Sequence, residues 1–125
     1  TMDYNNFLED VVSDLQETLN IAKKAGISKD TIILDPGVGF AKNYEQNLAI
    51  TNHLEVLDTL GCPVLLGTSR KSMIGLTLDL PADERVEGTL ATTVIGVMKG
   101  CSFVRVHDVK ENYRIIKMTE AILSK

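Results

Sequence analysis

The sequence predicts an α/β fold in which three parallel strands alternate with four helices. Helical patterns, with apolar residues every three or four positions, alternate with short apolar runs rich in β-branched residues. Each run stops in polar residues, and no linker or low-complexity tract interrupts the alternation. The 125 residues, of which 44% are hydrophobic, are enough for the core of one domain.

The first expected elements are a helix over residues 3–25 and a strand over residues 31–35. Apolar residues recur along the helix at spacings of three and four, and Gly26 followed by Ile27 predicts a Schellman end. The strand is a β-branched run that stops at Asp-Pro-Gly, which is typical of a buried parallel strand. A loop over residues 36–42 follows.

A second helix is expected from Asn43 to Gly61, because Asn43 and Gln46 have the spacing of a capping box. The second strand is expected over residues 62–67. A short helical turn within residues 69–76 follows that strand.

Pro81 is expected to open a third helix that runs to Gly100. Residues 102–107 then form the third strand. Asp108 and Glu111 have the spacing of an acidic capping box, which predicts the start of the last helix.

Three strands among four helices suit either a piece of a doubly wound sheet or part of a (β/α)8 barrel, which typically needs about 250 residues. The barrel fits better, because its strands build the active site with their carboxyl ends. Here the strands end in Asp35, in residues 69–72, and in Arg105 with His107. We expect these side chains to face one mouth of the barrel.

Charge and cysteine content narrow the function classes. The 13 Lys and Arg against 17 Asp and Glu give a net charge of −4, and the pI is near 5.1, which argues against nucleic acid as a partner. No apolar stretch approaches the roughly 20 residues of a membrane span, so we expect a soluble protein with no membrane partner. Cys62 and Cys101 form no CxxC pair, which favours reduced thiols in the cytoplasm over a zinc site. Residues 1–6 show no secretory signal, and the chain looks cut rather than begun because Met2 is not first.

Asp35 ends an apolar strand, so its carboxylate is expected at the rim of the core. One carboxylate matches two parallel donors, such as the amino and ring N–H groups of a heterocycle. A turn in which Asp35 accepts local backbone N–H groups is an equally good interpretation. Gly37 and Gly39 allow a tight path near a ligand, but Lys42 stands where a GxGxxG motif needs its third glycine. Phe40 either walls an aromatic substrate or belongs to the core.

Two further segments predict anion binding. Residues 67–72 place two cations and several hydroxyls directly after a strand, where a helical turn offers free N–H groups; a solvated basic turn is the alternative. Arg105 and His107 are two positions apart, so they share the inward face of a strand. A guanidinium stacks on a flat ring and forks to a phosphate, with the imidazole as a second donor. The alternative is a buried charge network with Asp108 or Asp35.

Four segments, in this order, are similar to dihydropteroate synthases, the folate-pathway enzymes: DPGVGF at 35–40, GTSRKSMIG at 67–75, ERVEGTLAT at 84–92 and RVHDV at 105–109. The resemblance covers nearly the whole chain. It implies that residues 1–125 are the C-terminal part of a pterin-binding (β/α)8 TIM barrel, with strands six, seven and eight present and the N-terminal half absent.

The resemblance implies transfer of a pterin-methyl group from its pyrophosphate ester to the amino group of p-aminobenzoate, which gives dihydropteroate and pyrophosphate. It assigns Asp35 and Lys71 to the pterin. Arg105 stacks on the pterin ring and, with His107, holds the pyrophosphate. The expected catalytic residues are therefore Lys71, Arg105 and His107.

The resemblance also implies the site of the second substrate. Phe40 lines the p-aminobenzoate pocket, and Ser72 with the helix N-terminus beside it receives the carboxylate. The full set of expected substrate-binding residues is Asp35, Gly39, Phe40, Gly67, Ser69, Arg70, Lys71, Ser72, Arg105 and His107.

The resemblance further implies Mg²⁺ bound with the pyrophosphate through a protein ligand outside this chain and no metal site within it. It also implies a homodimer of a family that is a sulfonamide target. Three strands do not complete the side-chain layers of a barrel, so the isolated chain is expected to have little or no activity. A non-catalytic pterin-binding or dimerisation module is the alternative function. A methyltetrahydrofolate methyltransferase domain is another alternative function. The SRKS and RVHDV segments argue against it, because they suit the anchoring of p-aminobenzoate and pyrophosphate, which the synthase in particular requires.

Overall fold

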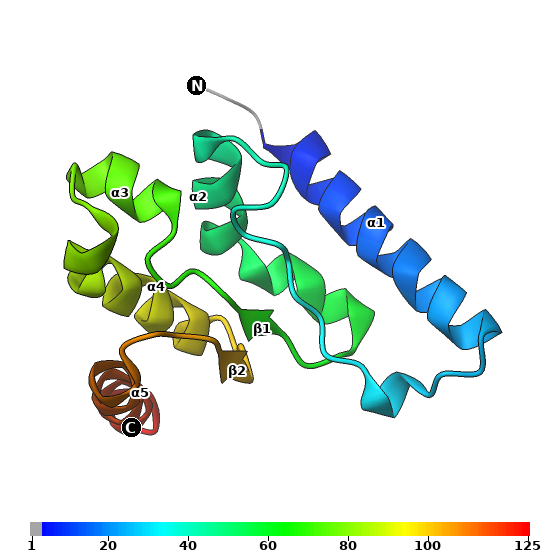
Figure 1. The fold of residues 1–125 in the computed structure, drawn as a ribbon. Helices are drawn as coiled ribbons and strands as arrows, with labels where there is room; N and C mark the ends of the chain where they lie inside the picture. Colours follow the sequence, from blue (N-terminus) through cyan, green and yellow to red (C-terminus); the bar gives the residue numbers. More distant parts are fainter. Residues whose placement is uncertain (1–3) are drawn as a thin grey trace.

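The computed structural model describes residues 4–125 (Figure 1). The expected start of the first helix at Asp3 lies outside the described residues. The elements follow in the order α1 (Asn5–Lys24), the 3₁₀ helix η1 (Lys29–Thr31), α2 (Tyr44–Asn52), the 3₁₀ helix η2 (Leu54–Leu60), β1 (Leu65–Leu66), α3 (Ser72–Leu78), the 3₁₀ helix η3 (Ala82–Glu84), α4 (Val86–Met98), β2 (Phe103–Val104) and α5 (Val109–Leu123).

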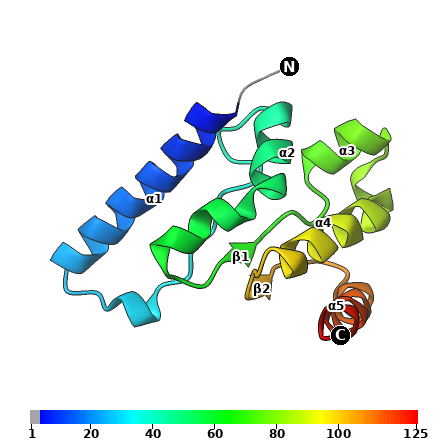
Figure 2. The ribbon, with the colours of Figure 1, turned by 180° about the vertical axis from the view of Figure 1, so that it is seen from behind.

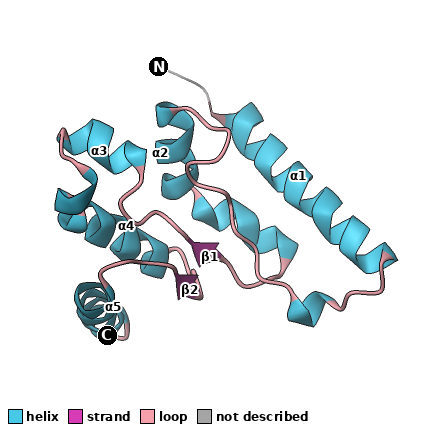
Figure 3. Ribbon diagram, in the orientation of Figure 1, coloured by secondary structure: helices cyan, strands magenta, loops and turns pink. Residues whose placement is uncertain are grey.

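The three expected strands lie side by side and parallel, but they are much shorter than the sequence indicates. β1 pairs with β2 in the register Leu65 to Phe103, and Leu34 makes one parallel bridge to Val64. A ladder needs a neighbour, and among residues 4–125 the outer sides of Leu34 and β2 have none. Figure 3 shows β1 and β2 as short arrows among helices and loops. The α/β character and the parallel order are confirmed, and the expected strand lengths are wrong.

Two of the sequence signals for helix ends are confirmed. At the end of α1, the Gly26 N–H donates to Lys23 O and the Ile27 N–H donates to Ala22 O, which is the Schellman pattern. Gly26 has φ +82°, the left-handed conformation that this end requires. At the start of α2, Asn43 and Gln46 form both hydrogen bonds of a capping box.

The expected second helix is two helices of different pitch. α2 ends at Asn52, and the chain continues as η2 to Leu60. Leu54, Leu57 and Leu60 are spaced by three, which is the period of a 3₁₀ helix, and all three are buried. The tighter winding of the 3₁₀ helix places all three leucines on the core side. In an α-helix, the third leucine would turn away from the core.

Of the last two expected helix starts, the one at Pro81 is wrong and the one at Asp108 is confirmed, since α5 begins at Val109. Pro81 opens only η3, and α4 begins at Val86 because the Arg85 backbone is not helical. At α5 the expected capping box is absent: the Asp108 carboxylate makes no cap hydrogen bond. It accepts instead from Arg70 Nη2 at 3.1 Å, so the carboxylate serves a distant loop rather than its own helix.

The ribbon runs from α1 at one end of the molecule to α5 at the other, with the short strands between them (Figure 2). One buried cluster joins Val38 to Ile50 and Leu54, and to Met73 and Ile74 of α3. The loop after Leu34 and the loop after β1 therefore rest on the same core. Within the described residues, no helix is both long and apolar enough to cross a membrane.

Candidate functional site

The carboxyl ends of the three parallel segments carry the polar side chains that the sequence singles out. Asp35 follows the Leu34 bridge, Lys71 follows β1, and Arg105 follows β2. Two long-range contacts join these ends: Arg105 Nη1 lies 3.5 Å from Asp35 Oδ2, and Ser69 Oγ lies 2.7 Å from His107 Nδ1. The structure thus brings together groups separated by up to 70 residues.

Asp35 forms the local turn that the sequence offers as one interpretation, and it also pairs with Arg105, which is the alternative given for that arginine. Its Oδ1 accepts from the Gly37 N–H at 2.8 Å, which is the local turn. Its Oδ2 faces the Arg105 guanidinium at the long distance of 3.5 Å. The Arg105 side chain is 58% exposed, so this ion pair is weak, and a ligand with better-placed donors is able to replace it.

We name residues 36–42 the first site loop. Lys71 Nζ donates a hydrogen bond to Val38 O and lies 4.9 Å from the centroid of the Phe40 ring. A Cβ at Gly39 would lie 3.0 Å from Lys71 Cδ, so this glycine leaves the room that the lysine stem occupies. Burial lowers the pKa of Lys71, and the nearby Asp35 carboxylate partly opposes this shift.

The first site loop is fastened by two residues that the sequence analysis missed. Lys42 Nζ donates to Gly37 O at 3.0 Å and to Phe40 O at 3.2 Å. Asn47, a buried residue of α2, accepts from the Gly39 N–H at 2.8 Å. A buried asparagine four residues after a helix cap is the signal for such a clamp, because buried amides have partners.

We name residues 67–71 the second site loop, and its fastening comes from helices. Thr68 Oγ1 lies 2.6 Å from Thr92 Oγ1 of α4. Arg70 has φ +58°, and its N–H donates to Thr89 Oγ1 at 3.1 Å. Its guanidinium is held by Asp108, so it points toward the connection between β2 and α5. Ser72, the first residue of α3, is exposed directly after this loop.

A small hollow of about 160 Å³ lies where the second site loop meets the end of β2. It is lined by Gly67, Ser69, Lys71, Arg105, Val106 and His107. A Cβ at Gly67 would meet the Arg105 guanidinium, so this glycine makes room for it. The expected shared face of Arg105 and His107 is confirmed by alternating exposure from Phe103 to His107, but the expectation that this face is buried is wrong. No element of the described residues covers it.

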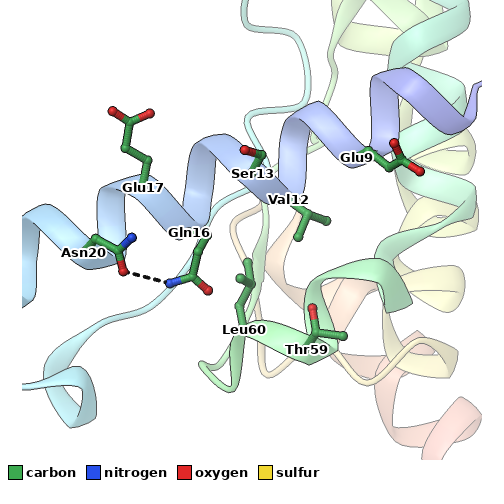
Figure 4. A pocket seen from close by; sticks show the side chains of 8 residues that line it. All are labelled: Glu9, Val12, Ser13, Gln16, Glu17, Asn20, Thr59 and Leu60. Carbon is green, nitrogen blue, oxygen red and sulfur yellow. Dashed lines mark hydrogen bonds between the residues drawn. The ribbon is translucent and has the colours of Figure 1, made fainter.

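A larger, shallow pocket of about 620 Å³ lies away from these groups, between α1 and η2 (Figure 4). Its lining combines the amide and hydroxyl side chains of Ser13, Gln16, Asn20 and Thr59 with the apolar side chains of Val12 and Leu60 and the carboxylates of Glu9 and Glu17. It holds no cation and no imidazole, and it resembles neither expected substrate site. Within residues 4–125, no group of three or more His, Cys, Asp or Glu side chains is arranged to hold a metal ion.

The fold and this set of groups define an α/β protein that gathers charged and polar side chains at the carboxyl ends of parallel strands, where proteins of this class carry their sites. A family model described as pterin binding enzyme matches residues 1–107, so the chain belongs to the pterin binding enzyme family. The resemblance found in the sequence is confirmed.

Individual relatives agree with this assignment. The dihydropteroate synthase of Clostridium beijerinckii is 62% identical over 97% of this chain and 45% of its own length, and that of Bacillus subtilis is 57% identical over 98% and 43%. Among solved structures, a Coxiella burnetii dihydropteroate synthase in complex with pteroic acid superposes with a TM-score of 0.93 at 42% identity, over 99% of this chain and 46% of that one. A Yersinia pestis dihydropteroate synthase in a sulfonamide drug complex superposes with a TM-score of 0.93 at 39% identity, over 99% and 45%. The chain thus spans slightly less than half the length of the curated relatives.

Proposed function

We propose that the protein carrying this chain is a dihydropteroate synthase, which joins a 6-hydroxymethyl-dihydropterin pyrophosphate to p-aminobenzoate. The observation that carries the proposal is the convergence of Asp35, Lys71, Arg105 and His107 at one edge of the parallel sheet. The similarity to dihydropteroate synthases supports it.

The pterin would lie against Asp35 and Lys71. Asp35 keeps lone pairs free beside the bond from Gly37 and the long contact to Arg105, so its carboxylate can accept from the amino and ring N–H groups of the pterin. Lys71 would turn its ammonium from Val38 O to the carbonyl and ring-nitrogen edge. Arg105, which is exposed and only weakly paired, is free to stack on the ring.

The pyrophosphate would occupy the hollow between the second site loop and β2. Arg105 and His107 line it, and Ser69 fixes the imidazole through Nδ1 at 2.7 Å. This contact leaves His107 Nε2 free to donate to an anion. The arrangement stabilises negative charge where the leaving group gains it.

The p-aminobenzoate would lie between Phe40 and Ser72. Phe40 is 65% exposed beside Lys71, so its ring face is available to an aromatic substrate. Gly39 and the Lys71 stem form the floor of this position. Ser72 would receive the carboxylate, together with the first N–H groups of α3.

The chemistry needs no nucleophilic side chain. The amine nitrogen of p-aminobenzoate forms the new bond to the pterin methylene, the methylene C–O bond breaks, and pyrophosphate leaves with the electron pair. The amine loses one proton to solvent. The protein contributes positioning and stabilisation of the leaving group. Because the described residues offer no metal cluster, no step assigned to them involves the expected Mg²⁺.

We also propose that residues 1–125 are the C-terminal part of the barrel and have little turnover alone. The exposed face of Phe103, Arg105 and His107 and the unpaired sides of Leu34 and β2 support this, since a barrel core is filled from all its strands. A synthase assay on the 125-residue chain, beside a complete enzyme, tests it; comparable turnover would refute it.

We further propose a cytoplasmic homodimer, formed through the C-terminal helices. The exposed apolar side chains of this region support it: Met98, Val109, Tyr113, Met118, Ile122 and Leu123. Sedimentation at several concentrations tests it, and a monomer at all of them contradicts it.

The decisive experiment for the proposed function is calorimetric titration with a pterin pyrophosphate analogue. Wild type should show saturable binding that Arg105→Ala loses, whereas Arg114→Ala, an exposed arginine of α5, should bind as wild type does. Binding without turnover in the full protein would favour the non-catalytic pterin-binding module. No binding by the folded full protein would refute both functions.

A further inference from the structure

Arg70 has an unusual backbone in the middle of the second site loop. Its φ is +58°, and the Lys71 N–H donates to Thr68 O at 3.0 Å to close a turn around it. Turns with positive φ at the third residue favour glycine there, because a Cβ crowds the backbone. An arginine stays in this conformation only if the surroundings hold it.

The start of α4 supplies that hold from both sides of the residue. The Arg70 N–H donates to Thr89 Oγ1 at 3.1 Å, and Arg85 Nη1 donates to Arg70 O at 2.8 Å. Arg85 Nε also donates to Leu80 O at 2.9 Å, which fixes the guanidinium. Arg85 and Thr89 are four positions apart and therefore lie on one face of the helix start.

The two neighbours of Arg70 both enter the site. Ser69 contacts His107, and Lys71 contacts Val38 O. The orientation of the residue 70 backbone sets the directions in which these side chains leave the chain. The ERVEGT segment, which the substrate assignments leave without a role, is thereby connected to the site.

We propose that Arg85 and Thr89 are positioning residues, which hold the Arg70 backbone in its left-handed conformation and thereby aim Ser69 and Lys71 at the bound substrates. The proposal rests on the proposed synthase function. Neither residue lines the hollow between the second site loop and β2.

Thr93 offers a matched control. Thr89 and Thr93 lie one helical turn apart on α4, they are 0% and 1% exposed, and each hydroxyl makes one long-range hydrogen bond. The Thr93 hydroxyl donates to Asn112 Oδ1 at 2.6 Å, toward α5 and away from the site. Thr89→Val and Thr93→Val remove the same atoms at similar burial, so they separate positioning from stability.

The variants are compared in the full protein by kcat, KM for each substrate, and amide hydrogen exchange at Arg70. Thr89→Val should lower kcat/KM by roughly tenfold, since displaced catalytic groups are costly, and should speed exchange at Arg70. Thr93→Val should change kcat/KM by less than about twofold at a similar loss of stability. Thr89→Ser, which keeps the hydroxyl, should restore both readouts.

Equal kinetics of Thr89→Val and Thr93→Val, or a Thr89→Ser variant no better than Thr89→Val, would overturn the proposal. If Thr89→Val does not fold, Arg85→Lys, which loses the forked contact to Leu80 and Arg70, replaces it with the same expected results. A wild type that neither binds the pterin analogue nor turns over refutes the synthase function instead. In that case the exchange rate at Arg70 still reports whether Thr89 holds the backbone.

Discussion

The two site loops present polar groups at neighbouring strand ends, but they are held in opposite ways. Apart from the bond from Lys71 to Val38 O, which links the two loops, the first site loop is fastened by hydrogen bonds that span 2, 5 and 8 residues, to Asp35, Lys42 and Asn47. The second is fastened by bonds that span 15, 19, 24 and 38 residues, to three residues of the α4 region and to Asp108. One loop is defined by its own sequence, and the other by the packing of helices.

This difference has a practical meaning for mutations. Changes in α3, α4 or α5 should disturb the second site loop and leave the first largely intact. Changes in the first site loop or in α2 should have the opposite pattern. The next three predictions test this separation.

The largest effect is expected at Gly75 of α3. A Cβ there would meet the Arg85 guanidinium and push it from Arg70 O and Leu80 O. Charged hydrogen bonds contribute about 1.5–3 kcal/mol each, and alanine regains about 1 kcal/mol of helix propensity, so Gly75→Ala should lower the free energy of unfolding by about 2–5 kcal/mol. Urea denaturation measures this.

The same substitution in an Arg85→Ala background provides the control. Without the guanidinium, only the gain in helix propensity remains, so Gly75→Ala should become stabilising. An equal loss in both backgrounds would show that the added methyl group clashes with something other than Arg85.

A smaller effect is expected at Asn47, the clamp of the first site loop. Asn47→Leu leaves the Gly39 N–H without its partner, which should cost about 1–2 kcal/mol and should speed amide exchange between Gly37 and Phe40. Exchange at Arg70 should stay unchanged. Asn52→Leu, on the exposed side of α2, should stay within about 0.5 kcal/mol of wild type. Faster exchange at Arg70 in Asn47→Leu would show that the two loops are coupled.

The smallest effect is a pH dependence that comes from Lys42 and Lys71. Burial lowers the pKa of both below 10.5, so the unfolded chain binds more protons as the pH rises toward that value. The free energy of unfolding should therefore rise slightly as the pH approaches 10.5, relative to that of a Lys42→Met/Lys71→Met variant. Burial also raises the pKa of the Cys101 thiol, so this group makes stability fall as the pH rises above 9.0. Cys101 is present in wild type and in the double variant alike, so its effect cancels in the comparison. Parallel curves for the two proteins would contradict the assignment.

The contrast between short-range and long-range hydrogen bonds also explains which features the sequence predicts. The end of α1 at Gly26, the cap at Asn43 and the turn at Asp35 depend on residues within a few positions, and the expectations for them agree with the structure. The convergence of the strand ends also follows from sequence, because parallel order alone brings carboxyl ends together.

The errors lie where a distant partner takes over a local group. Asp108 has the spacing of a cap, yet Arg70, 38 residues away, holds its carboxylate. The pattern after Pro81 predicts a helix that includes Arg85. Instead, the Arg85 side chain donates to Leu80 O and Arg70 O, and α4 begins only at the next residue, Val86. No periodicity in the sequence shows that the buried Thr89 hydroxyl contacts the second site loop rather than only filling the core.

The sequence separation of these hydrogen bonds also sets the order in which the two site loops can form during protein synthesis. The chain leaves the ribosome N-terminus first, so Asp35, Lys42 and Asn47 are all available to the first site loop soon after it is made. The second site loop waits until Arg85, Thr89 and finally Asp108 have emerged. A nascent chain halted before Arg85 therefore contains the short-range partners of the first site loop and none of the helix residues that fasten the second.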